Sequence, residues 1–385
     1  MAALTGVRVL ELSSMGPVPF CGMLLGDMGA DVLRIDRVDT SDNGIELDEQ
    51  YDLRGRNKRS AGIDLKHPKG RAAFLELVKS ADILLEGYRP GVTERLGIGP
   101  DDCLLIRPRL VYGRGTGWGQ EGALAHTAGH DLNYIALTGA LDMIGPRGGP
   151  PTPPLNLVGD YGGGALYLAF GVMCALHEAR SSGKGQVVDA AMVDGVTSLL
   201  TVFHGFRQAG KLDPRRGMNV LDGGAPYYTT YETQDGKYVA VGAIEPRFYG
   251  ILVEGLGLDA AALPSQDDRL HWPELRAVFT KRFQEQTLEE WVAVFNGSDA
   301  CFSPVIAIEE AGYQPHNASR CLFVNFEGLE HPAPTPRLSR TPGRLRRAPV
   351  FAGKDTVEAL QDWGISSESI SAGLSEGVFA NSKAT

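Results

Sequence analysis

The sequence predicts an α/β protein with a parallel sheet covered by helices on both faces. Short apolar runs, typical of buried strands, alternate with stretches of helical periodicity, and turns rich in Gly and Pro separate the two. Strands joined by helices of this length form parallel βαβ units. The strands are expected at residues 7–12, 31–36, 61–65, 82–86, 110–112 and 186–189, and the first two helices at 20–28 and 68–79.

A different pattern follows residue 224 and predicts a smaller α+β domain. Two strand-like runs, 227–232 and 237–243, flank the pair Asp235 and Gly236, which tolerates the positive φ angles of a tight hairpin turn. Three helices are expected after the hairpin, and the last opens with the capping-box spacing of Thr287 and Glu290. These helices are expected at 247–256, 273–283 and 288–295.

We therefore expect five regions along the chain. Residues 1–208 form the large sheet domain, 209–224 a polar linker, and 225–330 the small α+β domain. A segment rich in Pro and Arg, 331–349, forms a second linker. Two short helices occupy the last region, 350–385.

Composition and charge exclude several classes of partner and site. The 385 residues carry a formal charge of −10, which argues against nucleic acid as a partner, because phosphate binding needs a basic surface. No N-terminal run resembles a signal peptide, and the apolar stretch 161–176 is shorter than the ~18 residues of a membrane span, so we expect a core helix and no membrane partner. Five cysteines without C-x-x-C spacing predict reduced thiols and no metal site. Residues 382–385 do not match the Ser-Lys-Leu signal, and we expect a cytoplasmic protein.

His130 and Asp160 are the first candidates for a functional site. Each begins an expected helix after a flexible turn. The first N–H groups of a helix have no partner within it, so these two helix starts offer a base, a second acid–base group and free donors. Such a set suits removal of a proton beside a carbonyl. Taken alone, His130 also fits a helix cap or an interface, and Asp160 is an ordinary N-cap residue.

A cluster of basic residues needs an explanation in a chain this acidic. The glycine fingerprint of a dinucleotide-binding turn is missing after the first strand, where two prolines stand instead. Between Arg54 and Arg71 there are seven basic residues, opposed only by Asp64. Arg37 and Arg89 follow expected strand ends, where ligands of open parallel sheets bind. These positions predict an anionic ligand with several phosphates, and a solvated basic surface is the alternative.

Ten segments, taken in order along the chain, resemble the α-methylacyl-CoA racemase branch of the family III CoA-transferase superfamily. The resemblance covers most of the chain and weakens after about Ser303. Only the Gly-His-Asp block near residue 130 and the Ala-Ile-Glu-Pro block near residue 245 are specific singly, but the set is specific as a whole. The segments are 9–12, 27–32, 34–37, 57–60, 63–66, 129–134, 156–164, 183–189, 221–228 and 241–246.

The resemblance implies a Rossmann-like large domain built from both chain ends, a small domain between them, and an interlocked homodimer. The implied substrate is an acyl-CoA, so CoA is part of the substrate and no separate cofactor is expected. His130 and Asp160 would be the two acid–base residues and Glu245 would orient His130, while Asn156 and Tyr228 would belong to the active-site shell. The residues expected to contact CoA are Arg37, Ile63, Asp64, Leu65, Lys66, Arg89, Gly129, Leu132, Asn133 and Tyr134.

The implied reaction interconverts (R)- and (S)-2-methylacyl-CoA thioesters by α-proton abstraction, an enolate intermediate and reprotonation from the opposite face. Two groups on opposite faces suffice, and His130 and Asp160 would exchange roles between the two directions. The N–H of Asp131 and its neighbours can point at the oxygen that gains charge. Asp160 must then hold a proton near neutral pH, which requires burial or a hydrogen bond that favours the acid form.

Two alternatives stay open at the level of sequence. In a CoA-transferase of the same superfamily, Asp160 would be a covalent nucleophile that carries the acyl group and then CoA. The pairing of His130 with Glu245 favours the racemase, since a carboxylate nucleophile needs no opposing base. A non-catalytic acyl-CoA carrier would bind tightly without exchanging the α-hydrogen.

Overall fold

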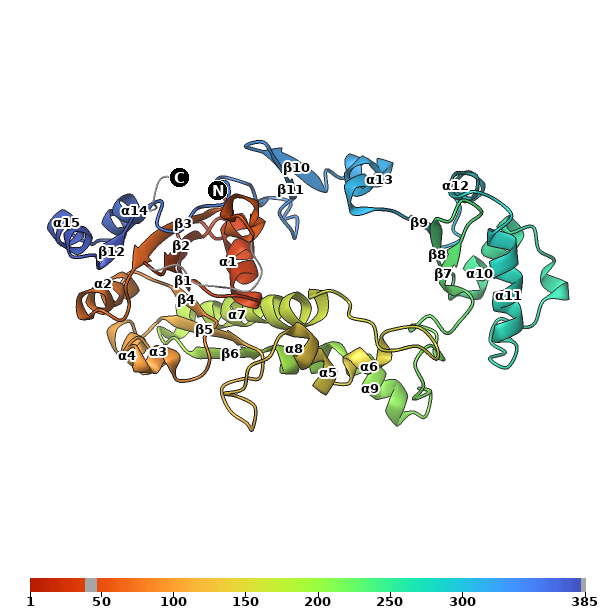
Figure 1. Cartoon of the computed structure of the whole chain (residues 1–385), viewed down its shortest axis with the longest axis horizontal. Coiled ribbons are helices and arrows are strands. Elements are labelled where there is room, and N and C mark those ends of the chain that lie inside the picture. Colours follow the sequence, from red (N-terminus) through yellow and green to blue (C-terminus); the bar gives the residue numbers. More distant parts are fainter. Residues whose placement is uncertain (39–46, 382–385) are drawn as a thin grey trace. The chain divides into compact units, whose positions relative to one another are not determined.

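The computed structural model describes residues 1–38 and 47–381, and it divides the chain into two compact units (Figure 1). The first unit comprises Met1–Thr138, Leu155–Leu199 and Cys321–Thr385, and the second comprises Gly139–Pro154 and Leu200–Arg320. These bounds differ from the expected ones at three places. Residues 139–154 and 200–208 group with the second unit, and residues 321–330 group with the first. The C-terminal tetrapeptide 382–385 lies outside the described residues.

The first unit is built on a seven-stranded sheet, which confirms the predicted α/β class. Its order is β12-β3-β2-β1-β4-β5-β6, and every pairing is parallel except that of β12 with β3. Without β12, this is the strand order 3-2-1-4-5-6 of the Rossmann fold. The strands are β1 (Arg8–Leu12), β2 (Asp31–Asp36), β3 (Lys58–Ile63), β4 (Ile83–Glu86), β5 (Val111–Thr116), β6 (Val187–Ala191) and β12 (Phe379–Ala380).

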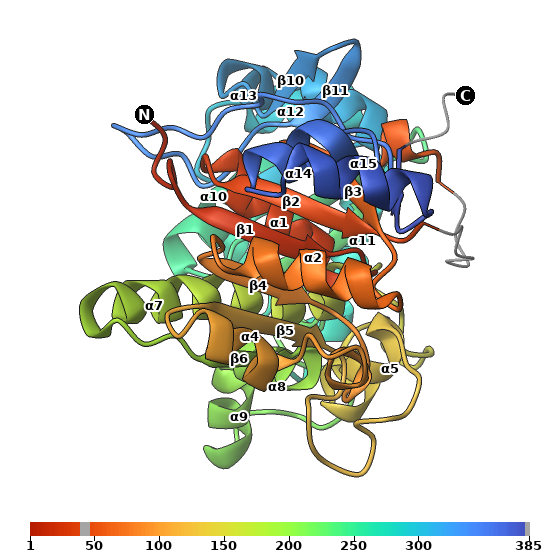
Figure 2. The ribbon, with the colours of Figure 1, turned by 90° about the vertical axis from the view of Figure 1, so that its left-hand side faces the viewer.

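Helices cover both faces of this sheet and give the first unit two hydrophobic cores (Figures 1 and 2). One core joins the sheet to helices that include two from the C-terminal end of the chain, with Phe74, Leu360 and Ile370 among its buried residues. The other joins it to α1 and α7, with Cys21 and Val172 buried. The first group is α2 (Pro68–Val78), α4 (Pro100–Ile106), α14 (Thr356–Asp362) and α15 (Ser367–Ser375), and the second is α1 (Pro17–Asp27) and α7 (Leu166–Ser182).

Strand β3 begins three residues before its expected start because charged residues are buried in it. Lys58 and Arg59 are almost fully buried, and Lys58 forms an ion pair with Glu11 of β1. A charge in a sheet interior is stable only with such a partner. A hydropathy pattern cannot anticipate a pairing between residues this far apart in sequence.

The apolar helix is longer than expected. A π-helical segment, η3 (Leu157–Ala165), runs directly into α7, and the 26-residue run from Leu157 to Ser182 is long and apolar enough to cross a membrane by length and composition. In the folded chain one side of it, with Leu168 and Val172, packs in the core against the sheet. The prediction of a core helix is therefore correct for that side of the helix. The prediction that the helix is too short to cross a membrane was wrong.

Short elements complete the first unit around this frame. The helix α5 (Asp131–Leu137) and the helix α8 (Met192–Leu199) both pack against η3. The hairpin of β10 (Phe323–Phe326) and β11 (Leu329–Pro332) precedes α14. The remaining pieces are the helix α3 (Val92–Arg95) and the 3₁₀ turns η1 (Glu49–Tyr51) and η2 (Leu53–Gly55).

The second unit is α+β, as predicted. Its antiparallel sheet has the order β7-β8-β9. The turn between β7 and β8 contains Gly236 at φ 71°, the positive φ angle that the predicted Asp-Gly turn requires. Thr287 and Glu290 form the expected capping box. The elements are α6 (Ala140–Met143), α9 (Thr201–Gln208), β7 (Tyr228–Glu232), β8 (Tyr238–Gly242), α10 (Pro246–Gly255), η4 (Ala260–Ala262), α11 (Trp272–Phe283), α12 (Leu288–Phe295), β9 (Phe302–Val305), η5 (Ile308–Tyr313) and α13 (Pro315–Ser319).

Candidate functional site

The candidate site lies beyond the carboxyl ends of β1 and β4, where the strand order of the sheet reverses. Ligands of doubly wound sheets bind at this point, because the loops after the two strands diverge to opposite faces and leave a crevice. The two loops lie side by side where they leave the strands, since a Cβ on Gly87 would lie 3.0 Å from the hydroxyl of Ser14. A Cβ on Gly16, which follows β1, would lie 3.6 Å from Oδ1 of Asp160. The Gly16 contact places the Asp160 carboxyl beside the loop after β1.

His130 begins α5, as predicted, in extended backbone at φ −130°. Its N–H donates to Oδ1 of Asn133 at 3.0 Å, so Asn133 fixes the entry into the helix. The hydroxyl of Tyr134 donates to the carbonyl of Gly129, and a Cβ on Gly129 would lie 2.8 Å from the Tyr134 ring. These contacts orient the segment 129–134 while the side chains of His130 and Leu132 stay exposed.

Asp160 lies in η3, three residues after the helix begins at Leu157. The expectation that Asp160 itself opens the helix was wrong, because the N-cap is Asn156. Nδ2 of Asn156 donates to Oδ2 of Asp160 at 3.0 Å, and Oδ2 of Asp131 accepts from the Asp160 N–H at 2.7 Å. Short π-helical segments occur frequently at functional sites. The structure thus brings Asp131, Asn156 and Asp160 together.

Burial raises the pKa of Asp160 above its ordinary value, and the charge of Asp131 raises it further. The hydrogen bond from Asn156 and the charges of His130 and Arg54 act in the opposite direction. Both His130 and Arg54 are therefore near enough to influence this carboxyl group. A raised pKa is what a carboxyl group needs if it is to hold a proton near neutral pH.

The predicted arginines lie at the same end of the sheet. Arg37 follows β2 and interacts with the hydroxyl of Tyr88, while Arg89 follows β4 and acts electrostatically on Tyr134. The loop that holds Tyr88 and Arg89 is held in place by Glu86, the last residue of β4. Oε2 of the buried Glu86 accepts from the Tyr88 N–H at 2.7 Å, and Oε1 of Glu86 accepts from Nε of Arg114 at 2.7 Å.

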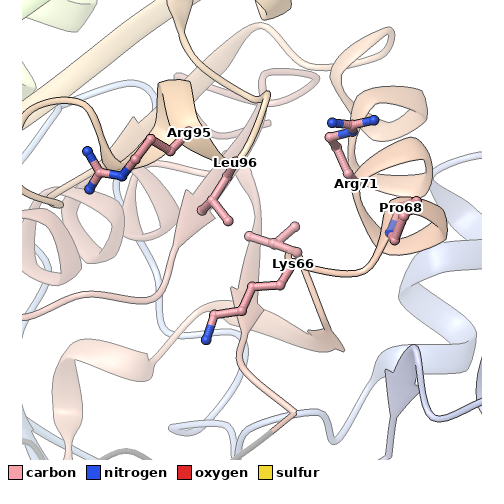
Figure 3. A pocket seen from close by; sticks show the side chains of 6 residues that line it. Lys66, Pro68, Arg71, Arg95 and Leu96 are labelled. Carbon is pink, nitrogen blue, oxygen red and sulfur yellow. The ribbon is translucent and has the colours of Figure 1, made fainter.

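A separate basic pocket follows the end of β3 and has a volume of about 220 Å³ (Figure 3). Lys66, Arg71 and Arg95 supply its charges from three elements, and Leu65, Pro68 and Leu96 supply apolar walls. Within residues 1–38 and 47–381, these three cations form no ion pair. Leu65 and Lys66 were predicted from the sequence as contacts to CoA, and Arg71 as a member of the basic cluster. Arg95 was missed, because the elements that line the pocket meet only in the fold. The pocket suits an anionic group.

Most residues of the basic cluster form ion pairs within the protein. The prediction that the cluster as a whole binds a ligand with several phosphates was therefore wrong in part. Asp64 was expected to be the only acid opposing it, yet carboxylates distant in sequence pair with most of its members. Only Lys66 and Arg71 stay available at the pocket. The pairs are Arg54 with Asp52, Arg56 with Asp27, Lys58 with Glu11, Arg59 with Asp31 and Asp362, and Lys69 with Glu376.

Two predicted residues belong to the second unit. Glu245 is the exposed N-cap of α10, and its charge raises the pKa of Cys301 together with the larger effect of burial. Tyr228 begins β7 opposite Gly242. Of the other predicted residues, Ile63 ends β3 as a buried core residue, and Oδ1 of Asp64 accepts from the Lys66 N–H at 2.9 Å.

Polar atoms in the loops after β1 and β5 are buried without a partner among the described residues. Among them are the hydroxyl of Ser14 after β1 and the indole N–H of Trp118 after β5. Nε1 of Trp118 lies 3.2 Å from where a Cβ on Gly129 would be, and its ring packs edge-on against Tyr134. Buried donors without partners are rare in native proteins and are commonly explained by a ligand or water.

The fold and these residues define a doubly wound α/β protein with ionisable side chains and a basic pocket at the carboxyl end of its sheet. A sequence profile of CoA-transferase family III matches residues 4–356. The chain belongs to this family, which confirms the resemblance seen in the sequence.

Relatives and solved structures agree with this assignment. The chain is 45% identical over 371 residues to α-methylacyl-CoA racemase of Mus musculus, and 44% identical over 373 residues to that of Homo sapiens. The alignments cover 95% and 96% of this chain and 95% of each relative. A CAIB/BAIF family protein from Brucella suis has the same fold, with a TM-score of 0.80 at 22% identity over 94% of this chain and 99% of that one. A hypothetical protein from Mycobacterium tuberculosis superposes with a TM-score of 0.76 at 25% identity, over 92% of this chain and 98% of that one.

Proposed function

We propose that this protein is an α-methylacyl-CoA racemase that interconverts (R)- and (S)-2-methylacyl-CoA thioesters. The observation that carries the proposal is the hydrogen bond from the Asp160 N–H to the carboxylate of Asp131, the residue that follows His130, in a chain 44–45% identical to enzymes of that name. Burial raises the pKa of Asp160. A thioester α-hydrogen is a very weak acid. Its removal needs a base on one face, an acid on the other, and donors for the oxygen that gains charge.

The proposed reaction balances with one proton removed and one returned. In one direction, neutral His130 takes the α-proton and protonated Asp160 delivers a proton to the opposite face. In the reverse direction, ionised Asp160 is the base and protonated His130 is the acid. The N–H of Asp131, at the first position of α5, would donate to the enolate oxygen, and the helix dipole would favour the same charge. The acid–base pair carries the same total charge before and after the reaction, and its extra positive charge in the intermediate balances that of the enolate.

We also propose how the acyl-CoA and a second chain take part. Lys66, Arg71 and Arg95 would bind a phosphate of CoA, and the segment from Gly129 to Tyr134 would line the thioester. The homodimer proposal is supported by exposed apolar residues on η3 and α7, among them Phe170 at 70% exposure, since large exposed apolar patches mark interfaces. In such a dimer, Glu245 and Tyr228 of one chain would complete the site of the other. Light scattering of the purified protein tests the dimer, and a monomer would contradict it.

Incubation of a chiral 2-methylacyl-CoA in D₂O tests the function. A racemase incorporates deuterium at the α-carbon and loses optical purity with no acceptor acid present. Movement of CoA to an added free acid, without α-exchange, would instead indicate a transferase with Asp160 as nucleophile. Tight binding with neither reaction would indicate a carrier.

Removing positive charge from the basic pocket is expected to weaken substrate binding without slowing the chemistry. The variants Lys66→Gln, Arg71→Gln and Arg95→Gln should each raise KM for the acyl-CoA about 3–10-fold, because each loses a charged contact to phosphate. The value of kcat should stay near that of the parent, and KM for an acyl-pantetheine thioester should not change. Lys79→Gln, on the exposed side of α2, is the matched control. Equal losses with both substrates would show that the pocket does not bind phosphate.

A further inference from the structure

We infer that two opposite charges, the Asp131 carboxylate and the Arg54 guanidinium, act on Asp160 from different elements and set how readily it takes up a proton. The inference rests on the proposed function, because it assigns positioning roles at the same site. Neither side chain needs to touch the reacting atoms. Asp131 acts from the first turn of α5 and Arg54 from η2, and these lie 77 residues apart in sequence.

Asp131 is held against the backbone of η3. The residue is buried, with 7% of its surface exposed, and its Oδ2 accepts from the Asp160 N–H at 2.7 Å. A Cβ on Gly159 would lie 2.4 Å from this same oxygen, so the close approach requires glycine at position 159. Asp131 therefore fixes the backbone of Asp160 and places a negative charge beside it. Because Asp131 directly follows His130, the same turn positions both proposed proton-transfer groups.

Arg54 interacts with the phenol of Tyr161, the chain neighbour of Asp160. Two guanidinium nitrogens of Arg54, Nε and Nη2, donate to the two carboxylate oxygens of Asp52 at 2.7 and 2.9 Å, which fixes the planar group. The Tyr161 ring packs on Phe20 of α1, with centroids 4.6 Å apart, so this tyrosine is fixed in place as well. The Arg54 charge thus faces the segment that carries Asp160.

Several other groups lie on the elements that pack around Asp160. His130 from the start of α5 is the proposed proton-transfer partner, and Asn156 donates to Oδ2. From α5, Tyr134 also interacts with Asp160, and burial raises the pKa of Tyr134 to about 12, so it stays neutral. Asp194 of α8 acts electrostatically on Asp189 of β6 and raises its pKa together with the larger effect of burial. The loop before α1 contributes the backbone of Gly16.

Asp131→Asn separates the charge of Asp131 from its hydrogen bond. The asparagine oxygen can still accept from the Asp160 N–H, but the negative charge is gone. In the direction in which Asp160 is the base, the acidic limb of the kcat/KM profile should move to lower pH by about 0.5–1 unit, because the carboxylate form of Asp160 is no longer opposed. Asp131→Ala loses the hydrogen bond too, and its kcat should fall about 10-fold below that of Asp131→Asn.

Arg54→Gln should move the same limb to higher pH by a similar amount, since a positive charge that favours the carboxylate is removed and Asp52 is left unpaired. Arg54→Lys keeps the charge and should restore the parent profile. Opposite shifts from two positions cannot come from general loosening of the site. The controls are Glu76→Gln and Lys79→Gln, which remove one charge of each sign from the exposed side of α2.

The result that would overturn the inference is a limb that stays in place in both variants, or that moves in the same direction in both. Circular dichroism identifies any variant that fails to fold. If one of the two variants is lost in this way, the direction in which the other moves the acidic limb tests the inference. If the parent protein itself exchanges no α-hydrogen, the proposed function fails. If the parent exchanges and the shifts are absent, only the charge assignment fails.

Discussion

Alanine at His130 or at Asp160 is expected to reduce racemisation at least about 10²-fold, the usual contribution of a positioned proton-transfer group. Each side chain serves both directions of the reaction, once as base and once as acid. Loss of either one therefore blocks inversion whichever enantiomer is supplied. Loss of optical rotation by a single enantiomer of 2-methylacyl-CoA measures this directly.

The two alanine variants are expected to differ in the exchange that they retain. With Asp160 removed, His130 can still take the α-proton from the enantiomer that faces it and return deuterium to the same face. Asp160→Ala should therefore exchange one enantiomer in D₂O without inverting it, and His130→Ala should exchange the other. Mass spectrometry and chiral separation of the recovered thioester distinguish the two. An Asp160→Ala protein that still racemises near the parent rate would remove Asp160 from the mechanism.

The parallel sheet could be predicted from the sequence because its signals are local. Apolar strands such as 31–36 and proline-started helices such as 68–79 are visible within a short window, and the structure has them as β2 and α2. The start of β3 could not be predicted. Lys58 and Arg59 look solvated in sequence, and their burial depends on Glu11 and Asp31, which are 47 and 28 residues away.

The candidate site was predictable only in part, for the same reason. His130 was predicted correctly as a helix start, whereas Asp160 lies within one turn of the true start, whose N-cap is Asn156. The residues that surround Asp160 come from other elements. Nothing in the segment around Arg54 indicates that it faces the Asp160 segment, and the only local signal was its spacing from Asp52, which holds its guanidinium group.

Lys58→Met is expected to destabilise the first unit by about 3–5 kcal/mol, because it leaves the carboxylate of Glu11 buried without its partner. Nζ of Lys58 donates to both oxygens of Glu11 at 2.7 Å, and both side chains are almost completely buried. Nζ also donates to the carbonyl of Pro19 at 2.8 Å. A Cβ on Gly22 would lie 1.7 Å from Oε2 of Glu11, so α1 packs directly on the pair.

The double variant Glu11→Leu with Lys58→Met distinguishes the loss of the ion pair from the cost of leaving one buried charge without its partner. Removing both charges leaves no buried charge unpaired, and the double variant should be more stable than Lys58→Met alone, by about 1–4 kcal/mol. The midpoint of urea unfolding measures each change, and Lys79→Met, which breaks the exposed pair with Glu76, should cost less than about 1 kcal/mol. Lys58 binds the carbonyl of Pro19 in the first turn of α1, and this turn follows the loop that contacts Asp160. If the Lys58→Met protein still folds, its kcat should therefore be lower than that of the parent. A Lys58→Met protein as stable as the parent would mean that Glu11 accepts a proton at little cost, and that α1 is held by its apolar face alone.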